Sequence, residues 1–231
     1  MLKVSGVFAQ SMVTLLIVSD QDIASTIQGD ALLARGGWLE KSKVEDGRVW
    51  NHENKDVWLW WFGKGFLMED GLDERFSAGI GRNVDEVIFL SRHYAASGRP
   101  SLTLHVLGVP GEYPHGERAE HGGIKGKVML PNPRFASWYR LMCDAAHRHQ
   151  LVPEFELTIE TTHHGPCLST PTMFIEIGSS ETHWGRVDAA EAWADVMEIG
   201  LGLDGGEERL SAVQLWARTH PGANRNGHGL E

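Results

Sequence analysis

Three clusters of polar residues come directly after, or end, apolar runs that have the length of a β-strand. Imidazoles and carboxylates that meet at one edge of a sheet can hold a zinc ion with an open position for water. The same groups can act without a metal as acid and base on an ester carbonyl. These residue types therefore indicate a hydrolase. The clusters are Ser91-Arg92-His93, Thr161 to Pro166, and Glu176 with Gly178-Ser179-Ser180-Glu181.

The adjacent histidines His163 and His164 are the most informative of these residues, because such a pair before Gly165-Pro166 is unusual in a turn. Neighbouring side chains on an extended chain point to opposite faces, so we expect at most one of the two to meet a substrate. The Gly-Pro turn is expected to direct backbone N–H groups at a developing oxyanion. His105, inside an apolar run, is interpreted as a hydrogen-bonded core residue.

The elements that must position these clusters alternate along the chain. We expect the run 13–19 to be a central strand buried on both faces, and Ser19 or Asp20 to cap the helix that follows it to about Arg35. A long loop, rich in glycine and histidine, spans 108–126, and loops of this length are often functional. Further strands are expected at 57–62, 86–91, 101–107, 154–161 and 172–177, and further helices at 132–149 and 188–203.

This alternation predicts an α/β fold, a three-layer sandwich around a mixed, mostly parallel sheet. In such sheets ligands bind beyond the carboxyl ends of the strands, which selects the three polar clusters. Residues 12–218 are expected to form a single domain, residues 1–11 an N-terminal extension and residues 219–231 a flexible tail. A chain beginning at Met12 should therefore keep its thermal stability.

The composition is that of an ordinary globular chain, with 231 residues, 42% hydrophobic and 23% charged. A formal net charge of −10 argues against a broad basic surface for duplex DNA. It leaves room for a local basic stretch, Lys125, Lys127 and Arg134, that could meet the phosphates of one RNA end. Two cysteines form no disulfide framework, which suits the cytoplasm. The first residues are too interrupted for a signal or a membrane span, and we expect a monomer without a membrane partner.

Longer stretches carry a more specific pattern. They are, in chain order, LLIVSDQDIAS with DALLARGGWLE, then VDEVIFLSRHYAASGRPSLTLHVLG, then EHGG, and finally LTIETTHHGPCLSTPTMFIEIGSSETHW. Together they resemble the archaeal and plant type of D-aminoacyl-tRNA deacylase, a family with D-tyrosyl-tRNA deacylase activity. The order and approximate spacing of the motifs match this family from about Met12 to Gly202.

The resemblance implies a phosphorylase/hydrolase-like fold and hydrolysis of the ester bond of D-aminoacyl-tRNA, which releases the free D-amino acid and tRNA. It also implies zinc as a cofactor and the aminoacylated 3′ end of tRNA as the partner. Chirality would be enforced by a pocket that clashes with an L side chain. The site residues expected on the matching motifs are His163, His164, Arg92 and Glu176 as catalytic groups, His93, His163 and Glu160 as metal ligands, and Ser91, Gly165, His121 and Gly122 as substrate-binding groups.

Two departures from the family pattern bear on activity. Cys167 stands after HHGP where family members carry threonine or serine, and the chain lacks the family's C-terminal GGGHY-type motif. Two alternatives therefore stay open. One is a metal-dependent peptidase or amidohydrolase of the same fold, and the other is a shortened, catalytically impaired homologue that only binds.

Overall fold

The computed structural model describes residues 12–112 and 121–208, so the expected extension, the expected tail and the middle of the long loop lie outside the described residues. The strands are β1 (Thr14–Ser19), β2 (Trp38–Val44), β3 (Gly47–His52), β4 (Val57–Phe62), β5 (Glu86–Arg92), β6 (Ser101–His105), β7 (Glu156–Ile159) and β8 (Thr172–Gly178). The helices are α1 (Ile23–Ala34), α2 (Leu72–Ile80), α3 (Phe135–Arg148), α4 (Glu181–Trp184) and α5 (Val187–Leu201).

The strands form one mixed sheet in the order β2-β3-β4-β1-β5-β8-β6-β7. Strand β1 is parallel to both β4 and β5, β5 is parallel to β8, and β6 is parallel to β7. The β2-β3, β3-β4 and β6-β8 pairs are antiparallel. The predicted central position of β1 is confirmed, and its uninterrupted burial agrees with a strand covered on both faces.

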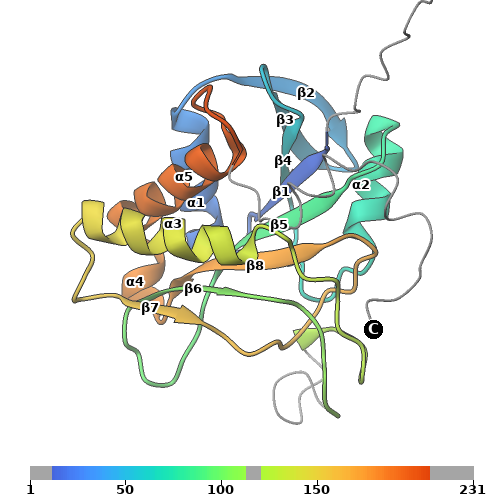
Figure 1. The fold of residues 1–231 in the computed structure, drawn as a ribbon. Helices are drawn as coiled ribbons and strands as arrows, with labels where there is room; N and C mark the ends of the chain where they lie inside the picture. Colours follow the sequence, from blue (N-terminus) through green and yellow to red (C-terminus); the bar gives the residue numbers. More distant parts are fainter. Residues whose placement is uncertain (1–11, 113–120, 209–231) are drawn as a thin grey trace, which may run out of the picture.

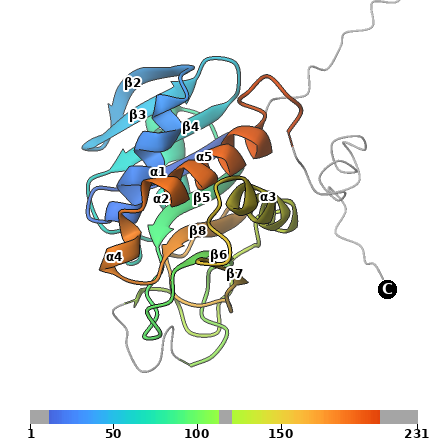
Figure 2. The ribbon, with the colours of Figure 1, turned by 90° about the vertical axis from the view of Figure 1, so that its left-hand side faces the viewer.

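Helices α1, α3 and α5 cover one face of the sheet (Figures 1 and 2). Alternate strand residues such as Leu16, Ile88 and Ile175 point into this helical layer, which holds one hydrophobic cluster. The other cluster, with Ile17, Phe89 and its neighbours, lies on the opposite face beneath α2 and the long connecting segments. The predicted three-layer α/β sandwich is confirmed. None of the described helices is both long and apolar enough to cross a bilayer.

The helix after β1 begins later than expected. Asp22, rather than Ser19 or Asp20, is the N-cap residue of α1, and its Oδ1 accepts hydrogen bonds from the N–H groups of Ala24 and Ser25 at 2.9 and 3.1 Å. The N–H of Ser19 donates to the side-chain oxygen of Ser25 at 2.8 Å, so Ser19 belongs to the strand end. The β2-β3 hairpin, α2 and α4 were not predicted.

Arg134, expected to meet tRNA phosphates, is a structural residue. Its side chain is 1% exposed, because its Nε donates to Glu86 at 2.6 Å and its two other nitrogens bond Gly200 O and Glu208. Glu86 is equally buried and also accepts from Thr14. A guanidinium bonded through all three nitrogens and buried to this extent is not available to solvent or RNA.

Substituting Arg134→Ala is expected to lower the free energy of unfolding by about 3–5 kcal/mol, because it leaves the Glu86 carboxylate buried without its partner. Urea denaturation measures the change. Arg99→Ala is the matched control: its ion pair with Glu156 is exposed on both sides and should contribute less than about 1 kcal/mol. Equal losses for the two variants would contradict a structural role for Arg134.

Candidate active site

The candidate site lies on the sheet face opposite α1, α3 and α5. Because β6 runs antiparallel to β8, His105 of β6 lies beside Phe174 in the middle of β8, and Thr103 lies beside Glu176. The segment after β7 crosses this face and adds His163, which forms an isolated parallel bridge with Leu107. The site thus occupies one face of the β5-β8-β6 region, in addition to the carboxyl ends of β5 and β8 that we expected.

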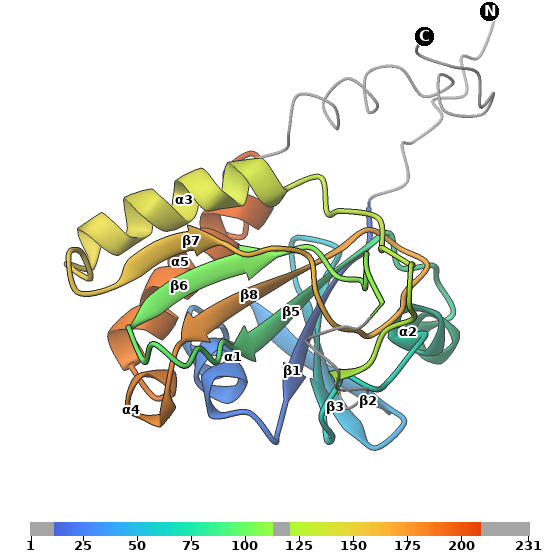
Figure 3. The same cartoon turned by 90° about the horizontal axis from the view of Figure 1, so that it is seen from below.

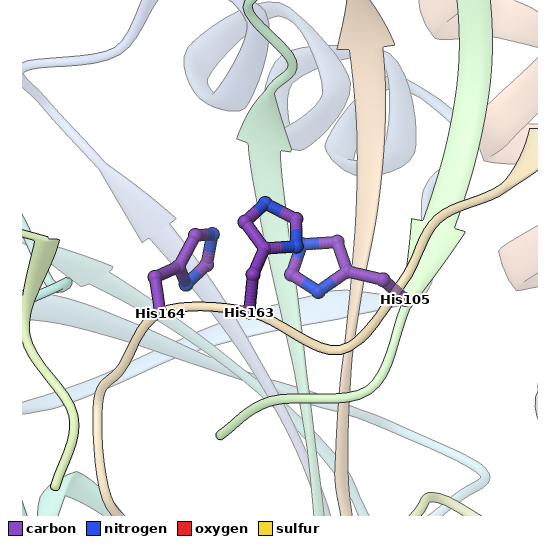
Figure 4. A group of neighbouring side chains, drawn as sticks. All are labelled: His105, His163 and His164. Atoms are coloured by element: carbon purple, nitrogen blue, oxygen red, sulfur yellow. The ribbon is translucent and has the colours of Figure 1, made fainter. Parts of the chain in front are cut away.

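Three histidine rings form the centre of the site (Figure 4). The ring of His105 stacks on that of His163, with centroids 4.3 Å apart, and meets His164 edge-on at 4.8 Å. One ligand atom from each ring lies within 4.8 Å of the others. His105 and His164 are buried, whereas His163 is half-buried at the rim of the cluster. His163 is therefore the member most accessible to a reacting molecule.

Each of these rings is oriented by a backbone carbonyl. The Nδ1 atoms of His105, His163 and His164 lie 3.1, 2.7 and 2.6 Å from the carbonyl oxygens of Val106, Thr161 and Gly165. A carbonyl oxygen only accepts hydrogen bonds, so each Nδ1 carries a proton and Nε2 of the neutral ring carries the lone pair. Histidines that hold metal ions or act as bases commonly have this second bond.

Burial, together with the neighbouring imidazoles, lowers the pKa of His163 and lowers that of His164 well below the ordinary value. Both rings are therefore neutral at neutral pH. Burial also disfavours the charged form of His105, but the Glu176 carboxylate, 3.8 Å from its Nε2, outweighs burial and raises the pKa of His105. No hydrogen bond of Nε2 of His105 is present among the described residues.

A second group joins His93 to two carboxylates. Nδ1 of His93 lies 3.0 Å from Glu160 and 3.6 Å from Glu176. Burial opposes protonation of the ring, but the two carboxylates outweigh it and raise the pKa of His93 to about 10. Glu176 is buried as well, yet His105 and His93 hold its pKa well below the ordinary value. This group therefore places a protonated imidazole, that of His93, against two carboxylates.

The two groups touch through Glu160, whose Oε2 lies 3.8 Å from Nε2 of His163. The structure thus gathers the expected residues His93, Glu160, His163, His164 and Glu176. It does not, however, place the three expected metal ligands in one cluster. His93 and Glu160 cluster with Glu176, whereas His163 clusters with the two other histidines.

Both rings of the histidine pair lie on the same side of the chain, although alternation along an extended chain would place them on opposite faces. That at most one of the two meets a substrate stays a prediction, and His163 is the more accessible ring. The backbone of His164 has φ 49°, in the left-handed region, so the chain is not extended there. This turn brings the ring centroids of His163 and His164 to 4.5 Å. A sequence argument based on alternation fails at such a residue.

The predicted EHGG loop packs directly on the histidine turn. The N–H of Gly165 donates to the carbonyl of His121 at 2.9 Å, so it is not available to an oxyanion as we had expected. A Cβ on Gly165 would lie 2.4 Å from the nitrogen of Gly123, and one on Gly122 would lie 1.8 Å from Leu67 O. The main chain of Gly122 and Gly123 therefore packs directly against that of the histidine turn at Gly165, with no room for a Cβ. We call this surface the glycine wall.

The change Gly122→Ala is expected to destabilise the fold by about 2–5 kcal/mol, because the new methyl group adds a steric clash to left-handed backbone strain. Gly126→Ala isolates the strain, since its φ of 73° is similar and nothing lies within 4 Å of its added Cβ. Thermal melts and urea titrations compare the two. A loss for Gly122→Ala no greater than for Gly126→Ala would show that this loop is loosely packed.

Besides His121, Gly122 and Gly165 of the glycine-rich loop and turn, four expected site residues lie outside the two groups. Ser91 is buried, and its hydroxyl lies within hydrogen-bond distance of Arg92 O at 3.3 Å and Asp22 Oδ2 at 3.4 Å, away from the histidines. The guanidinium of Arg92 lies over the ring of Trp184, 4.9 Å from its centroid, and not against the histidines. The side chains of Lys125 and Lys127 are exposed on the long loop, where Lys125 pairs with Glu112 at 2.5 Å.

His105 is the site residue that our sequence argument missed. We interpreted it as a core histidine, and it is indeed fully buried in a strand. A functional role is nevertheless possible for this buried ring, because its neighbours are two further histidines and Glu176. No local sequence pattern reveals these neighbours. The signal available in the sequence was the alternation of β6, which places Ser101, Thr103 and His105 on one face, away from the helical layer.

Comparisons with known proteins agree with this arrangement. The family model described as D-aminoacyl-tRNA deacylase matches residues 80–214. The D-aminoacyl-tRNA deacylase of Arabidopsis thaliana is 45% identical over 197 residues, which are 85% of this chain and 62% of the plant protein. That of Archaeoglobus fulgidus is 32% identical over 184 residues, 79% of this chain and 62% of the archaeal protein.

A crystal structure of a conserved protein of unknown function has the same fold, with a TM-score of 0.71 and 31% sequence identity. The match covers 86% of this chain and 65% of that one. The chain spans about six-tenths of the length of the two relatives described above. The family model covers more than half of the chain and includes both groups of site residues. The chain belongs to the D-aminoacyl-tRNA deacylase family.

Proposed function

We propose that the chain hydrolyses the ester bond between a D-amino acid and the 3′-terminal ribose of tRNA, as a step of translation quality control. One observation carries the proposal: three carbonyl-anchored imidazoles lie beside a carboxylate-imidazole group on one face of the sheet. The family's name supports the substrate. The site supports the reaction, because an activated ester needs only a positioned base and a stabilised anion.

His163 is the proposed general base. Its Nδ1 proton is held by Thr161 O, so Nε2 can take a proton from the attacking water. The resulting imidazolium would be stabilised by Glu160, 3.8 Å away. The ester carbon gains a bond to the water oxygen and loses its bond to the ribose oxygen, which leaves with a proton from His163. The amino acid and tRNA are then free.

The developing oxyanion needs donors, and the glycine wall offers them. Among the described residues, the N–H groups of Gly122 and Gly123 donate no hydrogen bond. They lie against the backbone of His164 and Gly165, next to the imidazoles. Because this wall is backbone against backbone, it is also too rigid to move aside for a wrongly placed side chain. We infer that it excludes L-amino acids by steric clash.

The residues present fit a zinc ion. His105 and His164 would hold it through Nε2, which leaves Nε2 of His163 free to act as the base. The ligand atoms of the three rings lie within 4.8 Å of one another, and Nε2 of His105 has no hydrogen-bond partner among the described residues. Imidazole nitrogens beside carboxylates suit the charge of the ion. Zinc bound there would lower the pKa of a water molecule and polarise the ester carbonyl.

The test offers the chain, with zinc present, a D-aminoacyl-tRNA and an N-acyl-D-amino acid with the same side chain. We expect release of amino acid from the tRNA only. Cleavage of the N-acyl compound alone would favour a peptidase or amidohydrolase of this fold. Binding of the tRNA without cleavage would favour a chain that only binds. The proposal further holds that the chain acts in the cytoplasm and as a monomer. Size-exclusion chromatography with light scattering measures the oligomeric state.

A further inference from the structure

Arg92 ends β5 and is placed by the strand on the side of the sheet away from the histidines. Its Cζ lies 4.9 Å from the ring centroid of Trp184 in α4. The indole Nε1–H of the same tryptophan donates to the carbonyl of His93 at 2.8 Å. Figure 3 shows α4 at the carboxyl ends of β5 and β8. One indole ring therefore connects the guanidinium to the backbone of an active-site histidine.

This guanidinium has no carboxylate partner among the described residues. The Asp22 carboxylate interacts electrostatically with Arg92, but it accepts its hydrogen bond from the backbone N–H of Arg92 at 2.8 Å and not from the guanidinium. A stacked guanidinium keeps the N–H groups along its edge available for an anion. Most other described arginines form ion pairs with carboxylates, namely Arg35, Arg75, Arg82, Arg99, Arg134, Arg148 and Arg186.

The place of this side chain suits a phosphate group of the substrate. Arg92 and His93 are consecutive, so their Cα atoms are about 3.8 Å apart, and their side chains diverge to the two sides of the strand end. An ester on the terminal ribose that reacts at the His93 side has the 5′-phosphate of the same nucleotide several bonds away. In α/β sheets, ligands bind beyond the carboxyl ends of the strands, and Arg92 lies at such an end.

We propose that the Arg92 guanidinium, held over Trp184, binds the 5′-phosphate of the terminal nucleotide whose ribose carries the ester. This inference rests on the proposed function, and it assigns Arg92 to positioning the substrate and not to the oxyanion. A planar guanidinium binds a phosphate with two parallel hydrogen bonds, which fixes both distance and orientation. The phosphate would thus set the ribose, and with it the ester, against the imidazoles.

The experiment compares two small substrates, a D-amino acid esterified to the ribose 3′-hydroxyl of adenosine, with either a 5′-hydroxyl or a 5′-phosphate. We expect the wild-type chain to show a kcat/KM about 10- to 100-fold higher with the phosphate, the range of a charge-assisted hydrogen bond. Arg92→Gln should abolish this preference and leave the rate on the 5′-hydroxyl substrate unchanged. Arg92→Lys should restore part of it.

Arg48→Gln is the matched control, because Arg48 also lies over tryptophan rings, those of Trp50 and Trp61 at 5.1 Å each, and no carboxylate pair is described for it. It should keep the full phosphate preference. A preference that survives in Arg92→Gln overturns the proposal. An equal loss on both substrates also overturns it, because Arg92 would then act at the ester itself.

A binding measurement separates this inference from the proposed function. Isothermal titration calorimetry compares adenosine 5′-monophosphate with adenosine, on wild type, Arg92→Gln and Arg48→Gln. Tighter binding of the monophosphate that disappears only in Arg92→Gln supports the phosphate site even if neither ester is cleaved, in which case the proposed function alone fails. Equal affinity of the wild-type chain for the two compounds rejects the phosphate site whatever the activity.

Discussion

Replacing His163 by alanine is expected to lower the rate of D-aminoacyl-tRNA hydrolysis by about 10²- to 10⁴-fold, the usual contribution of a general acid-base group. His163 is the half-buried member of the histidine group, and its Nδ1 proton is fixed on Thr161 O. Its removal should change the free energy of unfolding little. Initial rates at saturating and at limiting tRNA measure the effect on kcat and on kcat/KM.

The controls follow from burial. His147→Ala removes an exposed histidine of α3 and should keep full activity. His164→Ala should lose activity too, but it also empties a buried position next to Phe174, so a lower thermal midpoint is expected. His163→Ala retaining more than about a tenth of the wild-type rate would exclude a role of that size.

Removing zinc is expected to have the other large effect. Dialysis against a chelator should abolish hydrolysis, and returning zinc should restore it. Zinc at about 100 times its dissociation constant stabilises the folded chain by about 2.7 kcal/mol, which corresponds to a rise of roughly 5–10 °C in the thermal midpoint. This midpoint shift does not depend on turnover, so it tests the metal site even in a chain that does not react.

The histidine group should be responsible for that shift. His105→Ala removes one of its three imidazoles and should abolish the zinc-induced rise, although the variant itself melts lower because His105 is fully buried. His147→Ala should show the full rise. A rise that is unchanged in His105→Ala would place any bound zinc elsewhere, for example at His93, Glu160 and Glu176.

Most of the fold was predictable because the buried strands have a clear apolar pattern. Strands β1, β4, β5 and β8 lie within a residue or two of the expected bounds, since buried parallel strands read as uninterrupted apolar runs. The hairpin of β2 and β3 was missed because β2 is an edge strand that is mostly exposed, so its sequence shows neither alternation nor an apolar run. Helix α2 is short and has mixed polarity.

Site residues could be predicted from the sequence only where they end a strand or follow it directly. His93, His163 and Glu176 belong to the motifs found at strand ends, and the structure brings their groups together. The position of Arg92 depends on which face of β5 its side chain occupies. The role of His105 depends on the face of β6 and on the antiparallel β6-β8 pair. That pairing connects segments some seventy residues apart, and no short sequence pattern encodes it.

The most direct test of the account compares a D- and an L-aminoacyl ester of the same amino acid on the same tRNA, with initial rates corrected for spontaneous hydrolysis. We expect the chain to release the D-amino acid well above background, to favour it over the L-amino acid by at least about 100-fold, and to lose this activity in His163→Ala. Equal release of both amino acids, or release that His163→Ala leaves unchanged, would contradict a D-specific deacylase built on this histidine group.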